Sequence, residues 1–200
     1  MAHNAGDADA GTDEPVLEFT TQAEWEEWLS EKHDGSSGVW LRIARRGSGH
    51  VSPTYAEALD VALCWGWIDA RKRALDETAW LQRFTPRTPR SRWSQVNTRH
   101  AERLVADGRM QPSGLREMER AKADGRWTAA YASPRTATVP DDLAAALDAV
   151  PEAAAFFAGL DGRNRYAVLY RIESAKRPET REKRIRTLVA MLADGQKLYP

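Results

Sequence analysis

The sequence is poor in the residues that carry covalent or metal chemistry. Cys64 is the only cysteine among 200 residues, so no intramolecular disulfide can form. It lies in an apolar helical pattern, where a buried thiol behaves as a small hydrophobic group rather than as a nucleophile. The four histidines, at positions 3, 33, 50 and 100, show no H-x-x-x-H spacing, and no C-x-x-C occurs. We therefore expect no metal site and interpret all four histidines as exposed surface side chains.

Catalytic and nucleotide-binding signatures are also missing. The sequence has no G-x-S-x-G, no P-loop and no dinucleotide glycine pattern, and Gly-Ser-Gly at 47–49 is interpreted as a turn. No cofactor is implied, and an enzyme is not favoured. Asp69 is the only acid that we nominate for general acid or base catalysis.

Long hydrophobic runs are absent, which bears on the compartment. No run of about 18 apolar residues occurs, so we expect no transmembrane helix and no membrane insertion. The first residues, MAHNAGDADAGTDEP, are acidic and have no apolar centre, unlike a signal peptide. The sequence therefore predicts a cytoplasmic protein, with an apolar fraction of 42% that is ordinary for a globular chain.

A formal net charge of zero hides two oppositely charged blocks. Residues 1–38 carry ten acids and one base, a net charge of −9, and residues 71–109 carry ten bases and four acids, a net charge of +6. Such a separation calls for an explanation. One hypothesis is that the acidic segment shields the basic block by its own charge, an effect that salt would weaken.

Hydrophobic periodicity predicts an α+β fold for the first two thirds of the chain. A helix over about 21–32 begins with a capping-box spacing, and a second one begins at Thr54 and ends near Gly66. VWLRIARR alternates like a strand with one buried face, and WIDARKRA and AWLQRFTP read as two further strands joined by a turn. These features predict a small antiparallel sheet with flanking helices.

The composition changes near residue 130, because all eight tryptophans lie at or before Trp127. The rest of the chain is rich in alanine and predicts an all-helical part whose last two helices form an antiparallel pair. The charged residues of the last helix are interpreted as a solvated face. The predicted organisation is a disordered acidic tail (1–14), an α+β domain (15–127), a linker (128–137) and a helical domain (138–200).

The stretch RFTPRTPRSRWSQVN, residues 83–97, contains the candidate functional residues. Its two prolines predict an extended loop. An arginine fork suits carboxylate or phosphate, and the start of the next helix adds a positive dipole. With residues of the two preceding strands, the predicted ligand-binding group comprises Trp65, Trp67, Asp69, Arg71, Arg83, Arg87, Arg90, Trp93 and Asn97.

Two interpretations of this group remain open. In the functional one, Asp69, Arg71 and Arg83 converge from neighbouring strands and the tryptophans form the walls around a flat ring. In the structural one, the tryptophans belong to the core and the aspartate forms an ion pair with one arginine. Arginine clusters without a ligand are common, which favours the structural interpretation.

A resemblance to a known family rests on four segments: SPTYAEALDVALCWGWIDARKRALDE, RFTPRTPRSRWSQVN, DGRMQPSGLREMERAKADGRW and NRYAVLYRIESAKRPETREKRIRTLVAMLADGQKLYP. They resemble the YdeI/OmpD-associated (OmdA) family, whose members are often labelled bacteriocin-protection proteins. The resemblance runs from about Val39 to Pro200. It implies a bacterial-type stress or envelope-associated role, and it supplies no catalytic residue.

Three functions follow as hypotheses. The first is a non-enzymatic module that binds a small anionic ligand among the arginines and tryptophans. The second is an adaptor that docks a protein partner through the helical C-terminal part. The third, nucleic-acid binding through the basic segment, is less favoured because the chain as a whole is not basic.

Overall fold

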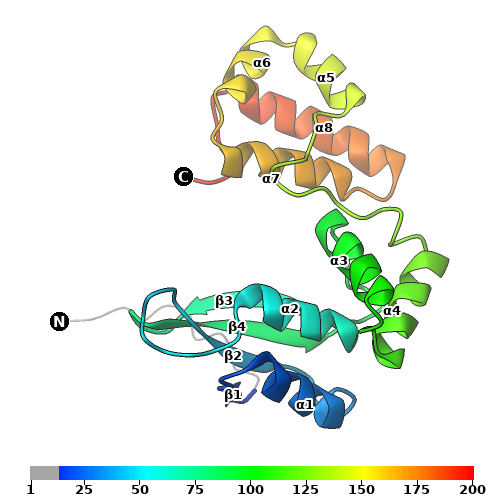
Figure 1. Cartoon of the computed structure of the whole chain (residues 1–200). Helices are drawn as coiled ribbons and strands as arrows, with labels where there is room; N and C mark the ends of the chain where they lie inside the picture. Colours follow the sequence, from blue (N-terminus) through cyan, green and yellow to red (C-terminus); the bar gives the residue numbers. More distant parts are fainter. Residues whose placement is uncertain (1–13) are drawn as a thin grey trace. The chain divides into compact units, whose positions relative to one another are not determined.

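The computed structural model describes residues 14–200 of the chain (Figure 1). The chain forms two compact units, which we call the N-terminal unit (residues 14–93 and 97–129) and the C-terminal unit (residues 94–96 and 130–200). The N-terminal unit is α+β and the C-terminal unit is helical, which confirms the predicted fold class. Apart from Glu14, the predicted disordered tail lies outside the described residues.

The sheet of the N-terminal unit has four strands in the order β1-β2-β4-β3. The strands are β1 (Val16–Leu17), β2 (Val39–Ala44), β3 (Trp67–Ala74) and β4 (Ala79–Pro86). The pairs β2/β4 and β3/β4 are antiparallel, as predicted, whereas β1 pairs parallel with β2. The sequence did not predict β1, because two residues are too short to show an alternating pattern.

Four helices complete the N-terminal unit. The first two begin where the capping residues predicted, since Thr21 and Thr54 each accept a hydrogen bond from the backbone three residues later. The bounds are α1 (Gln22–Lys32), α2 (Tyr55–Cys64), α3 (Gln95–Ala106) and α4 (Pro112–Ala123).

An aromatic core joins α1 to the sheet. Trp25 is fully buried, and its indole nitrogen donates to the carbonyl oxygen of Ala58 at 3.1 Å. Its ring lies 5.7 Å from the ring of Phe84 and 6.4 Å from that of Trp67. Large aromatic side chains bury much apolar area, so this cluster holds α1 and α2 against one face of the sheet.

The start of α4 lies very close to the end of α2. A Cβ atom added to Gly114 would lie 2.2 Å from the carbonyl oxygen of Cys64 and 2.5 Å from the sulfur of Met110. Only glycine permits this approach of one backbone to another. Cys64 itself is fully buried, as expected.

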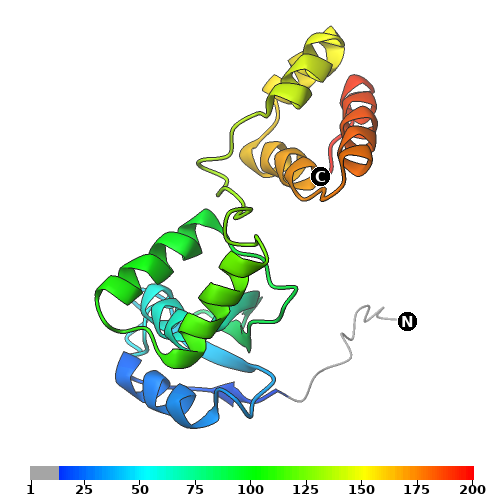
Figure 2. The ribbon, with the colours of Figure 1, turned by 90° about the vertical axis from the view of Figure 1, so that its right-hand side faces the viewer.

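The C-terminal unit consists of α5 (Asp141–Asp148), α6 (Pro151–Ala158), α7 (Gly162–Glu173) and α8 (Pro178–Ala193). Helices α7 and α8 run side by side in opposite directions, as the predicted pair (Figures 1 and 2). The apolar stripe of α8 is buried in the unit's core together with Leu143, Leu147, Ala153, Phe157, Val168, Leu169 and Ile172.

A buried asparagine ties the C-terminal residues to α7. Asn164 is 1% exposed. Its Nδ2 donates to Oδ2 of Asp161 at 2.9 Å and to the carbonyl oxygen of Tyr199 at 3.2 Å. The backbone N–H of Tyr199 donates to Oδ1 of Asn164 at 2.9 Å. These bonds satisfy a polar side chain that would otherwise be costly to bury.

Two of the histidines are not exposed surface groups, so that part of the prediction is wrong. Nδ1 of His33 lies 2.9 Å from the carbonyl oxygen of Leu29, and Nδ1 of His100 lies 3.1 Å from Oδ1 of Asp60. Both residues are half-buried and contact other parts of the fold, which the local sequence does not reveal. His50 is exposed as expected, and position 3 lies outside the described residues.

Candidate functional site

The sheet register separates two residues that we expected to converge. Asp69 on β3 pairs with Phe84 on β4, so both side chains lie on the same face. Arg83 precedes Phe84 and points to the opposite face, because side chains alternate along a strand. Asp69 instead accepts a hydrogen bond from the hydroxyl of Tyr55 at 2.8 Å. The expected convergence of Asp69 and Arg83 is therefore wrong.

Trp65, which follows α2, and Trp67, the first residue of β3, both contact His33 and do not form the walls of an open ligand site. Trp67 is 1% exposed, and its indole nitrogen donates to the carbonyl oxygen of His33 at 3.2 Å. The ring of Trp65 packs on the ring of His33, with 4.7 Å between centroids. Arg71 is exposed and lies at a β-bulge, where the register shifts between Asp69 and Lys72.

Arg83 does hold a carboxylate, but one from its own chain. Its Nε and Nη2 donate to the two carboxylate oxygens of Glu14, each at 2.6 Å. This is the bidentate geometry that makes an arginine–carboxylate pair strong. The side chain of Glu14 is only 3% exposed, so the pair is shielded from water on the acidic side.

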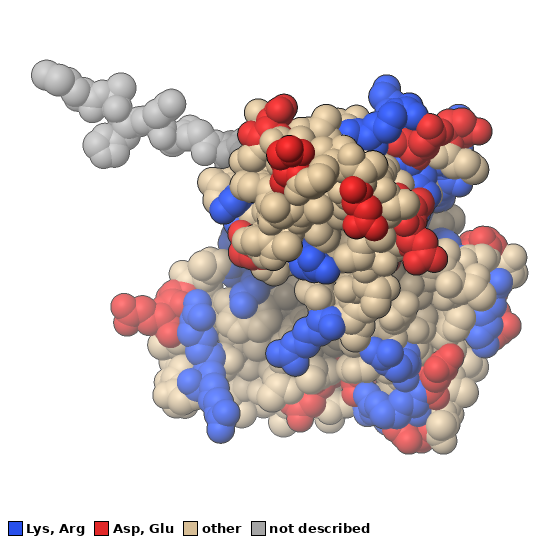
Figure 3. All heavy atoms as spheres, turned by 90° about the horizontal axis from the view of Figure 1, so that it is seen from above, with Lys and Arg blue, Asp and Glu red and all other residues tan. Residues whose placement is uncertain are grey.

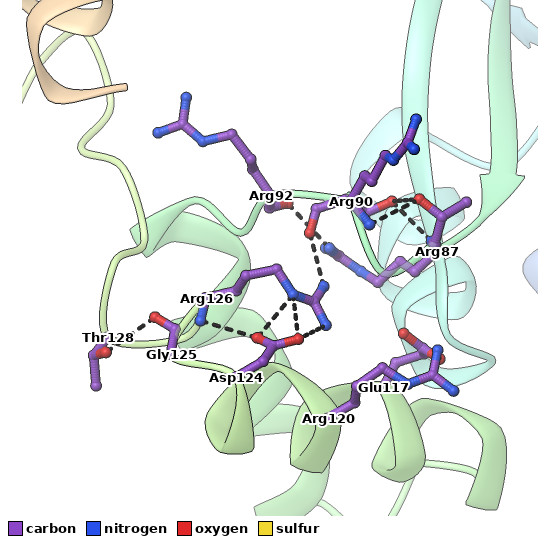
Figure 4. Close-up of polar contacts among 11 residues, drawn as sticks. Arg87, Arg90, Arg92, Glu117, Arg120, Asp124, Gly125, Arg126 and Thr128 are labelled. Atoms are coloured by element: carbon purple, nitrogen blue, oxygen red, sulfur yellow. Dashed lines mark hydrogen bonds and ion pairs between the residues drawn. The ribbon is translucent and has the colours of Figure 1, made fainter. Parts of the chain in front are cut away.

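Arg87 stabilises the loop in which it lies. It is 5% exposed, and its guanidinium lies 3.4 Å above the ring of Trp93, which is 2% exposed. Its Nη1 donates to the carbonyl oxygen of Arg92 at 3.1 Å (Figure 4). The ring of Trp93 packs in turn on that of Trp127, at 4.8 Å. Arg87 and Trp93 are thus part of the packing of the N-terminal unit.

The prolines predicted an extended loop after β4. The structure shows that part of this loop is a tight turn. Thr88 and Ser91 close a tight turn: the N–H of Thr88 donates to the hydroxyl of Ser91, and the N–H of Ser91 to the carbonyl oxygen of Thr88, both at 2.9 Å. Arg90 lies in this turn and is exposed. Figure 4 shows the side chains of Arg90 and Arg92 directed away from Asp124. Asn97 is half-buried in the first turn of α3.

Two arginines near this loop form ion pairs with acidic residues: Arg120 on α4 and Arg126, which follows α4. Nε of Arg126 donates to both carboxylate oxygens of Asp124, and its Nη1 donates to the carbonyl oxygen of Ser91 at 2.9 Å (Figure 4). The hydrogen bond from Arg126 lowers the pKa of Asp124. Arg120 forms an ion pair with Glu117 at 2.9 Å. The nine predicted residues thus fall into separate groups. Trp67, Asp69, Arg83 and Arg87 form hydrogen bonds within the chain, whereas Arg71 and Arg90 are exposed.

A basic hollow lies between α7 and α8 in the C-terminal unit. Its volume is about 480 Å³, a size typical of small-molecule sites. It carries three cationic side chains, four hydroxyl groups and one leucine, and no carboxylate. The lining residues are Tyr170, Arg171, Ser174, Thr180, Lys183, Arg184, Thr187 and Leu188.

Helical spacing brings the α8 residues of this hollow together. Thr180, Lys183, Arg184 and Thr187 follow i, i+3, i+4 and i+7 and therefore share one side of the helix. Arg184 is oriented by the end of α7, because its Nη1 donates to the hydroxyl of Ser174 at 2.8 Å and to the carbonyl oxygen of Arg171. One cation of the hollow is thus fixed in place.

Two acidic residues near α8 are paired with arginines outside the hollow. Arg181 donates to both carboxylate oxygens of Asp142, at 2.6 and 2.8 Å, and this lowers the pKa of Asp142. Arg186 pairs with Glu182 one turn away. Basic and acidic side chains are interspersed over the face shown in Figure 3. The concentration of positive charge in the hollow is therefore local.

The sequence contained a signal for this hollow that our interpretation missed. From the sequence alone, the arginines, lysines and glutamates of α8 are interpreted as a solvated face, because charged residues opposite an apolar stripe usually are. The sequence around α8 does not show that Tyr170 of α7 and Ser174, which follows α7, lie beside these residues. Tyr170 is itself positioned by an edge-on contact with Tyr131, with 5.4 Å between ring centroids.

Neither a membrane span nor a metal cluster is found in the described part of the chain. No helix there is long and apolar enough to cross a bilayer. No three potential ligands among histidine, cysteine, aspartate and glutamate gather within residues 14–200.

Comparison with known families divides the chain as the fold does. Residues 17–117 match the model of a domain of unknown function (DUF8412), and residues 136–195 match the model described as Bacteriocin-protection, YdeI or OmpD-Associated. No curated protein and no solved structure matches the chain. The expected resemblance is confirmed over 136–195, whereas the quoted segments at 52–77 and 83–97, and the first half of the segment at 107–127, lie in the match to the other family. The chain thus belongs to the DUF8412 family, and its C-terminal unit contains a domain that matches the YdeI/OmpD-associated, bacteriocin-protection model.

Proposed function

We propose that the protein is a non-enzymatic binding module that takes a small anionic ligand in the basic hollow between α7 and α8. The observation that carries the proposal is the lining itself, in which three cations and four hydroxyl groups meet without a carboxylate. Guanidinium, ammonium and hydroxyl groups are the usual donors to phosphate and carboxylate oxygens. The hollow lies entirely within the part of the chain that matches the YdeI/OmpD-associated family.

The lining residues suggest a division of roles. Arg184 is held by Ser174 before any ligand arrives, so little side-chain entropy is lost when it binds. Lys183 and Arg171 are exposed and supply further charge. Tyr170 and the buried Leu188 offer an apolar surface for the uncharged part of a ligand. The chemistry fits a compact phosphorylated or polycarboxylic compound.

A thermal-shift screen with inorganic pyrophosphate, nucleotides, sugar phosphates and citrate tests this proposal. A ligand at ten times its Kd should stabilise the folded chain by about 1.4 kcal/mol. For a unit of this size that is roughly a 5–10 °C rise in Tm, seen by far-UV circular dichroism. The effect should weaken as salt rises, because part of the attraction is between exposed charges.

Variants locate the site. The double variant Arg171→Gln/Lys183→Gln should lose most of the shift, since it removes two of the three cations that line the hollow. Lys176→Gln is the matched control, because Lys176 is exposed, lies in the α7–α8 connection and does not line the hollow. An equal shift in the double variant and in the wild type, or an equal loss in the control, would contradict the proposed site.

A protein-interaction adaptor is the second candidate, and an adjoining hollow favours it. This hollow has a volume of about 520 Å³ and is largely aromatic, with Tyr166, Tyr170 and Tyr199 beside Arg163. Tyrosine-rich surfaces with an arginine are common at protein interfaces. A photo-crosslinking residue at Ala167, which also lines it, should then capture one reproducible partner in cells. Capture that is indifferent to a Tyr166→Ala change argues against an adaptor.

The cellular setting is part of the proposal. We place the protein in the cytoplasm, in a stress- or envelope-associated role, on the strength of the sequence and the family resemblance. Cell fractionation and the bacteriocin sensitivity of a deletion strain test these two points. Nucleic-acid binding is the least supported function, and retention on heparin that falls with salt would be required to revive it.

A further inference from the structure

Residues 14–18 lie on the sheet like a bound peptide. Val16 and Leu17 pair parallel with Trp40 and Leu41 at the edge of β2. The N–H of Trp40 donates to the carbonyl oxygen of Pro15 at 3.0 Å. An extended segment that adds a strand to an exposed edge is a common mode of peptide recognition.

A slot in the sheet receives the carboxylate that begins this segment. The carboxylate of Glu14 accepts the two 2.6 Å hydrogen bonds from Arg83 and lies against Gly38. A Cβ atom added to Gly38 would lie 2.7 Å from Oε1 of Glu14 and 3.1 Å from the Cγ2 methyl of Thr85. The glycine therefore leaves the space that the carboxylate fills.

A second arginine matches a second acid of the segment. Nη1 of Arg42 lies 3.7 Å from Oε2 of Glu18. Arg42 lies two residues after Trp40 on β2, so the two side chains share a face. Trp40 pairs with Arg83, so both arginines lie on that face of the sheet. Residues four apart in an extended chain also share a face. The spacing of the two acids thus complements the two arginines.

The segment forms only a short strand at the edge of the sheet. Its strand is two residues long, and Val16 is 49% exposed. Short edge segments with little buried apolar surface open locally far more often than a core strand does. We therefore expect this segment to open more often than the ladder between β2 and β4.

We infer that the edge of β2 with Arg42 and Arg83 is a receptor for an extended acidic peptide of a partner protein, and that residues 14–18 occupy it in cis. The peptide would carry a glutamate over the Gly38 slot, apolar residues along β2 and an acid four residues after the first. This site lies in the N-terminal unit and is independent of the basic hollow.

The test uses the full-length chain and a fluorescein-labelled peptide with the sequence of residues 10–20, AGTDEPVLEFT, followed by fluorescence anisotropy. In the wild type, the tethered segment competes at a millimolar effective concentration and masks the site. Glu14→Gln loosens the segment, and peptide affinity should rise at least tenfold. Adding Arg83→Gln to that variant should abolish the gain. Glu27→Gln, an exposed acid of α1, is the matched control and should change nothing.

A second measurement keeps the inference testable if Glu14→Gln does not fold. In the wild-type chain, amide exchange at Trp40, whose acceptor is Pro15, should be at least tenfold faster than in the β2/β4 ladder. Equal exchange at both places would show an integral strand and overturn the inference. So would failure of the peptide to bind a folded Glu14→Gln chain. Concentration-dependent dimerisation that Glu14→Gln abolishes would assign the site to a second copy and also overturn it.

Discussion

Replacing Asn164 by alanine should unfold the C-terminal unit at a markedly lower temperature. The side chain makes three hydrogen bonds, two as donor and one as acceptor. One joins it to Asp161, just before α7, and two join it to Tyr199 near the C-terminus. Each such bond contributes about 1 kcal/mol, and the backbone groups of Tyr199 would lose a partner in a site where Asn164 is 1% exposed. The expected loss is about 2–4 kcal/mol.

The distribution of tryptophans provides a selective assay. All eight tryptophans lie at or before Trp127, so their fluorescence reports only on the N-terminal unit. Far-UV circular dichroism also reports on the four helices of the C-terminal unit. A loss of this size in a unit of about 70 residues corresponds to a Tm lowered by roughly 10–20 °C. The helical transition should move, and the fluorescence transition should stay.

The control and the refuting results follow from the same bonds. Lys197→Ala changes an exposed residue of the same C-terminal segment and should alter stability by no more than about 0.5 kcal/mol. A Tm for Asn164→Ala within a degree or two of the wild type would refute the reasoning about the buried amide. Equal displacement of both transitions would refute the division into two units.

Three further predictions concern packing and pH. Gly114→Ala should destabilise the N-terminal unit by about 2–3 kcal/mol in urea unfolding followed by tryptophan fluorescence, because the new methyl group would overlap the carbonyl oxygen of Cys64. Burial raises the pKa of the Cys64 thiol from 9.0 to about 11, so Ellman's reagent should react at pH 8 only after unfolding. The same shift stabilises the folded chain below pH 9, and this contribution is lost as pH rises toward 11. The hydrogen bond from Arg181 lowers the pKa of Asp142 below its ordinary value of 3.8. The stability that this ion pair contributes is therefore present above pH 3.8, and it is lost as the pH falls through the lowered pKa. Asp142→Asn should flatten that acid dependence by less than about 1 kcal/mol, measured as the urea midpoint by circular dichroism, since the pair is partly exposed.

Local signals predicted the secondary structure where one stretch of chain determines it. The capping threonines before α1 and α2 mark those helix starts, and Gly66, near which the second helix was predicted to end, adopts a positive φ of 76°. The sequence did not predict strand β1, because its two residues show no pattern of their own and form a strand only by pairing with β2.

The candidate site depended on information that a local pattern does not contain. The sequence showed Asp69 and Arg83 on neighbouring strands, but only the register places them on opposite faces. It identified Arg83 as suited to a carboxylate, and the structure shows one there, from a residue 69 positions away. The basic stripe of α8 was visible, whereas the neighbouring hydroxyls of α7 become part of the same hollow only through the packing of two helices.

Chemical-shift mapping on the ¹⁵N-labelled full-length chain tests the central claim, that the basic hollow binds anions, most directly. Titration with inorganic pyrophosphate should move the amide signals of Ser174, Lys183 and Arg184 in a saturable way, and should leave those of Arg87 and Trp93 in place. Shifts confined to the loop after β4, or no saturable shift at millimolar pyrophosphate, would contradict it.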